Sequence, residues 1–464
     1  MFSKSKMHFE ISERKLILRL FDVFFVLLAL YVLGRFFVFD YFSISATNYY
    51  WTIVLAIYIN FFGTIFEMYN LQVASNQFQV LKSTLITSSI TVLVYLLTPF
   101  FSPVLPSSRL QILLFFSITF ISLYLWRILY VVFLASNRFY QKGILICDHE
   151  RVQELINGLE VIDPHYKIVG YVDVSQLVSK KIDYNYVSEI MGGDLLRFVQ
   201  ENNVAEVVVA THHAEGINTG LYQTLLQVLE SGTIIREYTQ VYESKTQRIP
   251  IQYMEKDFYR CFPFSRSNHN KLYLIIVRFC EILASLLGIF ISLFLIPFLL
   301  IGNSIGNKGN LFYLQDRVGK NGVVFKILKF RTMIENAEKN GAVFTAINDC
   351  RVTAFGKFLR KTRIDEFPQF INILKGDMSV IGPRPERPVF VKEIGVIMPF
   401  YDTRHIIKPG LTGWAQVNYS YGDTISDSLI KLQYDLYYIK HRSIYLDLNI
   451  VFKTITTVLF YRGQ

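Results

Sequence analysis

The sequence predicts a multidomain membrane protein with a four-helix transmembrane bundle, a Rossmann-like α/β domain and an α-rich domain that contains a re-entrant membrane helix. The chain of 464 residues is 52% hydrophobic with a mean hydropathy of +0.32, which indicates several units and contact with lipid. Four long apolar segments come first, alternating short strands and helices follow, and a fifth apolar segment precedes a basic C-terminal region. We place the domains at residues 1–138, 139–262 and 263–464.

The first four apolar segments are each about long enough to cross a bilayer. They lie near residues 20–39, 49–66, 83–101 and 110–134. Basic residues precede the first segment and follow the fourth, whereas the first external loop has no Lys or Arg, so the positive-inside rule places both ends in the cytoplasm. Asp22 and Arg35 lie near segment ends, where side chains can reach the interface, and we favour this explanation over a transport role.

Short strands and helices alternate in the next part of the chain. Strands are expected at residues 143–148, 167–174, 205–210 and 233–238, and helices at residues 150–162, at 195–203 and after Asn218. Alternation of this kind is typical of a parallel sheet covered by helices. The sequence therefore predicts a Rossmann-like α/β domain.

The same domain lacks the usual signals of a ligand site. Its first strand leads into Cys-Asp-His-Glu at residues 147–150, without the glycines that let backbone amides approach a pyrophosphate. NAD binding is therefore not expected, and a regulatory or oligomerising role is preferred. His212 and His213 have no third ligand at suitable spacing, so we assign them to a loop and not to a metal site.

The fifth apolar segment, residues 282–301, decides the topology of the C-terminal region. By length alone it is another transmembrane span. Both of its flanks are basic, however, which places both of them in the cytoplasm. Pro297 offers a way to turn back, because an interior proline removes a backbone hydrogen bond and kinks a helix. We predict a re-entrant helix at about residues 272–301, with a straight fifth span as the alternative.

An adjacent acidic pair, Asp365 and Glu366, stands in a basic stretch and is followed by a rigid Gly-Pro-Arg-Pro turn that carries Arg384. Cations on both sides let a multiply charged anion approach a carboxylate, which favours phosphate chemistry. The other interpretation is structural, with one of the acids as the cap of a helix. Its buried stripe would consist of Phe367, Phe370, Ile371 and Leu374. The two interpretations are compatible, because a helix start also favours a bound phosphate.

Further blocks stand on both sides of this stretch. They are QDRVG at 315–319, KFRTM at 329–333, KPGLTGWAQV at 408–417 and YDLYYI at 434–439. Together with the acidic pair, these blocks resemble the catalytic core of the bacterial polyprenyl-phosphate glycosyl-1-phosphate transferases, also called monotopic phosphoglycosyl transferases. The resemblance keeps the family's order across roughly residues 271–464.

This resemblance implies an α-rich catalytic domain with a re-entrant membrane helix. It implies a phosphotransferase that moves a sugar 1-phosphate from a UDP-sugar to a polyprenyl phosphate such as undecaprenyl phosphate. Asp365 would be the nucleophile of a covalent phosphosugar intermediate formed with release of UMP, and Glu366 would hold Mg²⁺. Substrate-binding residues are expected at Lys329, Arg331, Arg363 and Arg384, with Arg317 as a further candidate.

The implied product, a polyprenyl-diphospho-sugar, initiates exopolysaccharide, capsule or O-antigen synthesis. The implied location is the bacterial inner membrane, with the α/β and catalytic domains facing the cytoplasm, and the expected partners include the lipid bilayer and a second copy of the chain in a homodimer. The sugar is glucose, galactose or an N-acetylated relative, of which we favour glucose or galactose. No nucleic-acid-binding motif accompanies the basic residues between 308 and 363, so nucleic acid is not an expected partner.

Other classes of function explain less of the sequence. A transporter or flippase accounts for the four spans, but not for a basic C-terminal region with an acidic pair. A membrane-anchored sensor accounts for the α/β domain and for a helix cap at Asp365. Direct glycosyl transfer to a polysaccharide would require separate acceptor-base and metal-binding motifs, which we do not find.

Overall fold

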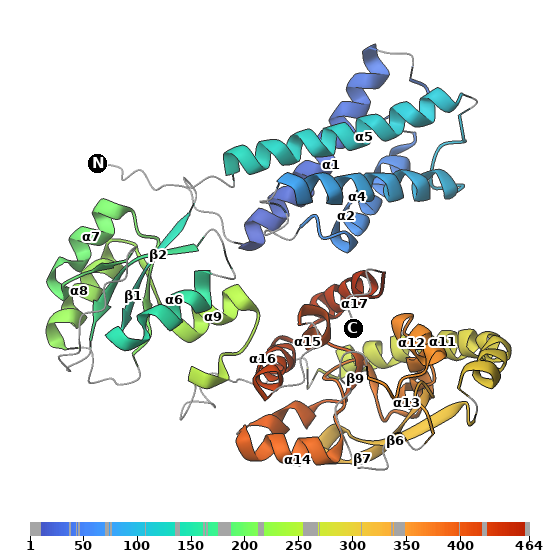
Figure 1. The fold of residues 1–464 in the computed structure, drawn as a ribbon. Helices are drawn as coiled ribbons and strands as arrows, with labels where there is room; N and C mark the ends of the chain where they lie inside the picture. The colour runs from blue at the N-terminus through green and yellow to red at the C-terminus, as the bar shows by residue number, and fades with distance from the viewer. Residues whose placement is uncertain are drawn as a thin grey trace. The chain divides into compact units, whose positions relative to one another are not determined.

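The computed structural model describes residues 11–36, 39–42, 44, 47–69, 74, 77–106, 108–134, 140–160, 163, 166–174, 187–211, 218–253, 268, 270–307, 309–335, 337, 349–398, 400–419 and 425–459. The chain forms two compact units, Met1–Thr246 and Gln247–Gln464 (Figure 1). The first contains a helical bundle and an α/β sheet, and the second contains a long apolar helix and the acidic pair. The predicted boundaries near residues 138 and 262 lie outside the described residues.

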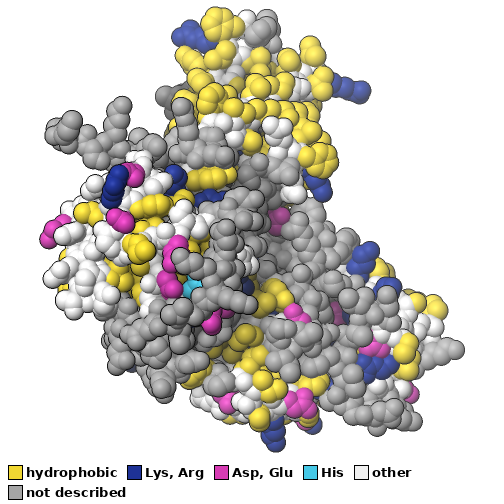
Figure 2. Space-filling model, turned by 60° about the vertical axis from the view of Figure 1, so that its left-hand side comes forward, with side chains coloured by type: hydrophobic (Ala, Val, Ile, Leu, Met, Phe, Trp, Pro, Cys, Tyr) yellow, Lys and Arg dark blue, Asp and Glu magenta, His cyan; other side chains and the backbone are white. Residues whose placement is uncertain are grey.

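Among the described residues, four long helices form the N-terminal bundle, at the positions of the four predicted apolar segments. They are α1 (Ile11–Phe36), α2 (Tyr49–Ile65), α4 (Gln77–Leu97) and α5 (Arg109–Leu129), the last continued by a π-helical turn at Tyr130–Leu134. By length and composition α1, α4 and α5 can cross a membrane, and α2 is a shorter apolar helix. Apolar side chains gather on the surface over these helices, in the upper part of Figure 2, as expected of a surface that faces lipid.

A buried ion pair joins α1 to α5. Arg127 donates from Nε to Asp22 Oδ1 over 3.0 Å and from Nη2 to Asp22 Oδ2 over 2.5 Å, and its Nη1 donates to the carbonyl of Met68 over 2.6 Å. The side chains of Asp22 and Arg127 are 0% and 1% exposed. The prediction that Asp22 reaches the interface is therefore wrong, because its charge is matched by Arg127 inside the bundle. Arg35 is exposed, as expected.

The α/β part is a parallel sheet of five strands in the order β3-β2-β1-β4-β5. The strands are β1 (Gln141–Cys147), β2 (Tyr166–Asp173), β3 (Ser188–Glu189), β4 (Glu206–Val209) and β5 (Ile234–Glu237), and the helices are α6 (Val152–Glu160), α7 (Leu195–Asn202), α8 (Thr219–Glu230) and α9 (Tyr238–Thr246). The predicted alternation of strands and helices is confirmed. β1 is buried from Gly143 to Cys147, which fits its place at the centre of a sheet covered on both faces. His212 and His213 lie outside the described residues.

The second unit combines a β-hairpin with short helices. Its strands are β6 (Phe312–Val318) and β7 (Val324–Phe330), which are antiparallel, and β8 (Ser379–Ile381) and β9 (Gly410–Thr412), which are parallel. Its helices are α11 (Lys271–Gly306), α12 (Ala354–Lys361), α13 (Gln369–Lys375), α14 (Pro388–Ile397), α15 (Trp414–Asn418), α16 (Ile425–His441) and α17 (Ile444–Leu459). An apolar cluster that includes Trp414, Leu436 and Ile450 forms much of its core.

Helix α11 extends over 36 residues and stays helical through Pro297. One of its faces contacts the rest of the second unit near its start, middle and end, at Tyr273, Glu281, Gly288, Leu299 and Asn303. Other positions expose large apolar side chains, among them Leu272, Ile275, Phe279, Phe290, Phe294 and Ile305. The helix therefore lies along this unit over its whole length and presents an apolar outer face.

Candidate active site

The acidic pair lies on a 3₁₀ turn, Ile364–Glu366, between α12 and α13. Arg363, just before the turn, has a left-handed backbone with φ 58°, a conformation that is kept where surrounding contacts fix it. Its N–H donates to Arg360 O over 3.1 Å, and its carbonyl accepts from Glu366 N–H over 3.2 Å. The turn directs both acids inward, so that Asp365 is 8% and Glu366 is 9% exposed.

Three cations converge on one oxygen of Glu366. Its Oε1 lies 3.3 Å from Arg384 Nη2, 3.4 Å from Arg363 Nη1 and 3.9 Å from Lys329 Nζ. Lys329 comes from β7, Arg363 from the start of the turn, and Arg384 from the loop after β8. The structure thus brings these three predicted residues together around the predicted acidic pair.

The two carboxyls differ in their electrostatic surroundings. Burial raises the pKa of Asp365, and the negative charge of Glu366 raises it further. Burial alone would also raise the pKa of Glu366, but the positive charges of Arg384 and Lys329 outweigh burial and hold this pKa well below its usual range. Burial lowers the pKa of Lys329 to about 8. Adjacent carboxyls with pKa values displaced in opposite directions are suited to different roles in one site.

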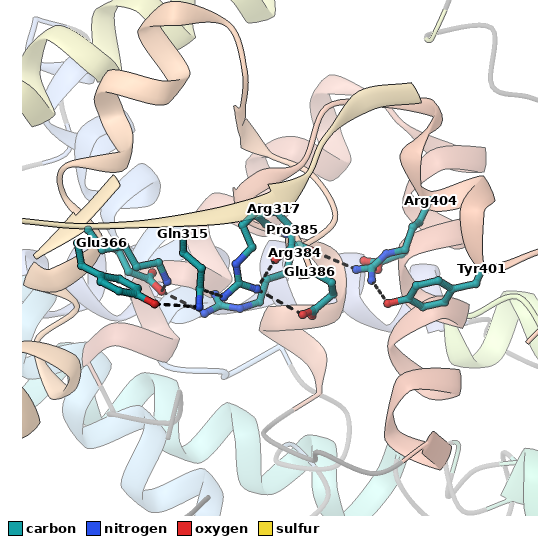
Figure 3. Close-up of polar contacts among 11 residues, drawn as sticks. Gln315, Arg317, Glu366, Arg384, Pro385, Glu386, Tyr401 and Arg404 are labelled. Carbon is teal, nitrogen blue, oxygen red and sulfur yellow. Dashed lines mark hydrogen bonds and ion pairs between the residues drawn. The ribbon is translucent and has the colours of Figure 1, made fainter. Parts of the chain in front are cut away.

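Arg317 contacts the loop that carries Arg384. Its Nη1 donates to Pro385 O over 2.9 Å and lies 3.5 Å from Glu386 Oε2, and its Nη2 donates to Gln315 Oε1 over 2.6 Å (Figure 3). This predicted substrate-binding residue therefore holds the loop in place at the edge of the site.

Arg331 lies apart from the acidic pair. Its Nη1 lies 3.0 Å from Glu335 Oε1, and its Nη2 donates to Asn307 O over 3.4 Å. Asn307 Nδ2 in turn donates to Arg331 O over 2.8 Å. These contacts place Arg331 at the end of α11. Lys329, two residues earlier at the end of β7, lies beside Glu366 instead.

The alternative that one of the acids caps a helix does not hold. The N-cap of α13 is Pro368, which makes no side-chain cap hydrogen bond, and both acids lie in the preceding turn. The buried residues of α13 are Gln369, Asn372 and Ile373, whereas Leu374, part of the expected stripe, is 37% exposed. Of these buried residues, Gln369 lines the pocket described below, Asn372 bonds to the backbone of β7, and Ile373 packs with Ile327 and Met378.

A small pocket adjoins the acidic pair. Its lining consists of Arg317, Ile327, Lys329, Gln369, Arg384, Pro385 and Gly410. Gln369 is 3% exposed and its Nε2 has no hydrogen-bond partner, and Asp365 Oδ1 also lacks one. Buried polar atoms are rarely left unpaired, so this arrangement favours a polar, anionic ligand. Sequence reasoning missed Gln369, although its place one turn after Asp365 was an available signal.

The acidic pair meets the requirements of a hard divalent cation. Mg²⁺ is commonly held by one or two carboxylates and completed by phosphate oxygens of a substrate. Asp365 Oδ1 is buried and unpaired, and Glu366 stays ionised beside its cations. Among the residues that the structure describes, no group of three or more His, Cys, Asp or Glu side chains could hold a metal ion. A metal at the acidic pair would therefore need phosphate oxygens of a substrate as further ligands.

A comparison with protein families matches the second unit. The model described as "Bacterial sugar transferase" covers residues 272–461. This range contains the acidic pair, the pocket and nearly all of α11 to α17. The matched family thus coincides with the part of the chain in which the candidate site lies.

Several curated proteins are similar over the same region. A UDP-N-acetylgalactosamine-undecaprenyl-phosphate N-acetylgalactosaminephosphotransferase of Aeromonas hydrophila is 45% identical over 223 residues, 47% of this chain and 51% of that protein. A UDP-glucose:undecaprenyl-phosphate glucose-1-phosphate transferase of Klebsiella pneumoniae is 42% identical over 151 residues, 32% of each protein. The uncharacterized sugar transferase EpsL of Bacillus subtilis is 37% identical over 153 residues, 33% of this chain and 72% of EpsL. The chain thus spans about half or less of the first two proteins and most of the third.

Proposed function

The chain belongs to the bacterial sugar transferase family, and from this premise we propose that it transfers a sugar 1-phosphate from a UDP-sugar to polyprenyl phosphate. The lipid is undecaprenyl phosphate, and the products are UMP and a polyprenyl-diphospho-sugar. The observation that carries this proposal is the buried acidic pair under three converging cations, beside a pocket lined by cations. Such a site suits a diphosphate substrate and a carboxylate nucleophile.

Two displacements at one phosphorus atom account for the transfer. First, a carboxylate oxygen of Asp365 attacks the phosphorus that bears the sugar, and the bond from this phosphorus to the bridging oxygen breaks, so that UMP leaves with the electron pair. Second, a phosphate oxygen of the lipid attacks the same phosphorus, and the bond to Asp365 breaks. The unpaired Oδ1 of Asp365 and its raised pKa suit this nucleophilic role.

The cations around Glu366 serve the charged substrate. Arg384 sits between two prolines, which limit the loop's freedom and direct a guanidinium fork at phosphate. Lys329 adds a buried positive charge, and Arg363 adds a third cation from the turn itself. Fixed cations of this kind stabilise the negative charge on a transferring phosphoryl group without reorganisation during the reaction.

We assign Mg²⁺ to Glu366. The lowered pKa keeps this carboxyl ionised, which metal binding requires. Glu366 would hold the ion against the diphosphate, where Mg²⁺ would supply positive charge to neutralise the phosphate oxygens. The neighbouring Asp365 is left as the carboxylate that reaches phosphorus, because its Oδ1 is buried without a hydrogen-bond partner among the described residues, whereas Glu366 Oε1 lies close to three cations.

Helix α11 is proposed as a re-entrant helix that holds the site at the cytoplasmic face of the membrane. A straight span needs about 20 residues away from the soluble part of the chain, yet α11 contacts the second unit at both ends, where Tyr273 donates to Asp447 and the C-cap residue Asn307 donates to Arg331 O. Arg278 on α11 also donates to the carbonyls of Ile373 and Leu374 at the end of α13, both over 2.7 Å. The apolar outer face would thus enter lipid while the inner face holds the helix that follows the acidic pair.

This location lets a water-soluble nucleotide sugar and a membrane-bound phosphate meet in one site. The α/β and catalytic domains would face the cytoplasm at the bacterial inner membrane, and the product would initiate exopolysaccharide, capsule or O-antigen synthesis. The relatives are named for N-acetylgalactosamine and for glucose. Glucose and galactose stay the favoured sugars, and the N-acetylated sugars are tested beside them. A homodimer is also proposed.

The test is release of UMP by purified full-length protein from UDP-glucose, UDP-galactose and their N-acetylated counterparts, with undecaprenyl phosphate and Mg²⁺. Release from one sugar that is lost in Asp365→Asn and Glu366→Gln supports the proposal. Asp402→Asn is the matched control, because the side chain of Asp402 is 83% exposed in the same unit, and it should keep full activity. No release from any sugar, or full activity of Asp365→Asn, would overturn the proposal.

A further inference from the structure

Four consecutive backbone carbonyls in the loop that carries Arg384 accept hydrogen bonds from three other segments of the unit, two of the bonds coming from β6. The pairs are Gly410 N–H to Pro383 O at 2.9 Å, Arg404 Nη2 to Arg384 O at 3.0 Å, Arg317 Nη1 to Pro385 O at 2.9 Å, and Val318 N–H to Glu386 O at 2.9 Å. Two donors are backbone groups of strands β6 and β9, and two are arginine side chains. The loop is therefore held at every peptide around Arg384.

Arg404 makes the bond to the carbonyl of Arg384 itself. The Arg404 side chain is 6% exposed. Its Nη2, the atom that donates to Arg384 O, also lies 2.8 Å from Asp435 Oδ2, and its Nη1 donates to Tyr401 Oη over 2.5 Å. Figure 3 shows Arg404 between the loop and Tyr401. Asp435, on α16, is 2% exposed, so the positive charge of Arg404 is matched inside the unit, and its Nη1 and Nη2 are directed at fixed acceptors.

We propose that Arg404 is a positioning residue that acts on the reaction through Arg384, by fixing the peptide from which the Arg384 guanidinium reaches Glu366. Arg404 Nη2 holds the carbonyl of Arg384, and Arg384 Nη2 lies 3.3 Å from Glu366 Oε1. Arg384 thus makes both contacts, one through its backbone carbonyl and the other through its guanidinium. The activity readout of this inference rests on the proposed transferase function.

An arginine is required at this position because one planar group must serve three acceptors. Its Nη2 is shared by Arg384 O and Asp435 Oδ2, and its Nη1 serves Tyr401. Lysine carries the same charge but lacks the rigid fork, so it can keep the ion pair with Asp435 only at the expense of the loop contact. Arg404→Lys should therefore release the loop without leaving Asp435 unpaired.

The test is a double-mutant cycle between Arg404→Lys and Arg384→Lys in the full-length protein. Misplacement of a reacting group by about 1 Å can cost roughly 100-fold in rate, and we expect Arg404→Lys to lower kcat by roughly 10- to 100-fold. In the Arg384→Lys background the same substitution should cost little more, because the guanidinium on which it acts is gone. Tyr401→Phe removes the acceptor of Arg404 Nη1 and leaves both bonds of Nη2, so its kcat should fall less than that of Arg404→Lys.

Arg442→Lys is the matched control. Arg442 is also a buried arginine of this unit, 9% exposed, and it stacks on Tyr273 and Tyr438 away from the loop. Its substitution should lower the melting temperature by an amount similar to that of Arg404→Lys, and its effect on kcat should be small and additive with Arg384→Lys. Additive effects for Arg404→Lys, equal to those of the control, would overturn the inference.

Affinity for UDP, measured by calorimetry on the same variants, separates this inference from the proposed function. UDP carries the diphosphate that Arg384 would bind, and its binding needs no sugar transfer. A non-additive loss of UDP affinity supports the positioning role even if the wild-type protein turns over no sugar. Additive losses, or no UDP binding together with no turnover, contradict the positioning role.

Discussion

Asn372 on α13 donates a hydrogen bond from Nδ2 to the backbone carbonyl of Lys326 on β7 over 2.9 Å. Its Oδ1 accepts from the N–H of Leu328 over 3.0 Å. One amide side chain thus occupies a donor and an acceptor of the strand that carries Lys329. Because α13 begins just after the acidic pair, this contact fixes the distance between Lys329 and Glu366.

Replacement of Asn372 by Ala should lower both stability and activity. A buried polar group left without a partner costs about 1–3 kcal/mol, and the substitution leaves the Lys326 carbonyl and the Leu328 amide without their Asn372 bonds. We expect a loss of about 1–3 kcal/mol in the free energy of unfolding, together with slower release of UMP. Thermal unfolding and the UMP assay measure the two effects.

Asn202→Ala is the control for this prediction. The Asn202 side chain donates to Phe198 O, within its own helix, over 3.1 Å. Asn202→Ala should lower the free energy of unfolding by a few tenths of a kcal/mol, roughly as a surface substitution does, and leave UMP release unchanged. Equal effects of the two variants would contradict a special role of Asn372.

Gly356 allows α12 to lie directly on the backbone of Thr332. A Cβ at position 356 would lie 1.9 Å from the carbonyl oxygen of Thr332, whereas a Cβ at Gly395, on α14, would meet nothing within 4 Å. Gly356→Ala should destabilise the protein by about 3 kcal/mol, the upper part of the range for overpacking. Gly395→Ala should stabilise it by about 0.5–1 kcal/mol through helix propensity. Melting temperatures of the two variants that shift in the same direction would contradict this account.

Local patterns predicted the bundle, the parallel sheet, the long apolar helix and the acidic pair, whereas the resemblance to a known family implied that Lys329, Arg363 and Arg384 belong to the same site. These features follow from apolar length, strand and helix alternation, and short motifs. Contacts between residues far apart in the sequence that share no motif, such as the Asp22–Arg127 pair, were not predicted, because they depend on how elements pack. Arg127 lies 105 residues from Asp22.

The role of Arg317 shows the same limit for a residue inside a motif. The resemblance made Arg317 a candidate for substrate binding, and it does line the pocket, but its contact with Pro385 O could not be predicted from the sequence. Gln369 and Arg404 carry no motif of their own in our sequence analysis. Their importance becomes visible only through burial and through the atoms that they contact.

The Asp22–Arg127 pair should be sensitive to loss of one partner. Removing one member of a buried ion pair leaves an uncompensated charge and typically costs about 3–5 kcal/mol. We expect Asp22→Leu to lower the melting temperature in detergent strongly. The double variant Asp22→Leu with Arg127→Leu should recover most of this loss, because apolar residues replace a matched pair at little cost. A double variant that is as unstable as the sum of the single variants would contradict the pairing.

His405 should make the stability of the second unit depend on pH. Burial and the positive charge of Arg404 lower the pKa of His405 to about 4, although Asp402 acts in the opposite direction. Between about pH 6.5 and 4 the unfolded chain therefore takes up a proton that the folded chain does not, and stability falls as pH falls. The loss from this residue should reach about 2 kcal/mol at pH 5.

A comparison of melting temperatures at pH 7 and pH 5 measures this contribution. The wild-type protein should lose more stability on acidification than His405→Gln does. Equal losses in the two proteins would show that His405 is protonated in the folded state.

The proposed covalent step at Asp365 is tested most directly by incubating the full-length protein with a UDP-sugar and Mg²⁺ in the absence of polyprenyl phosphate. We predict release of about one UMP per protein molecule and a gain of one sugar phosphate in mass on the peptide that contains Asp365. Addition of undecaprenyl phosphate should remove this mass, and Asp365→Asn should show neither signal. The account would be contradicted if the protein turned over in the presence of the lipid but, without the lipid, released no UMP and formed no adduct. An adduct on another residue would also contradict it.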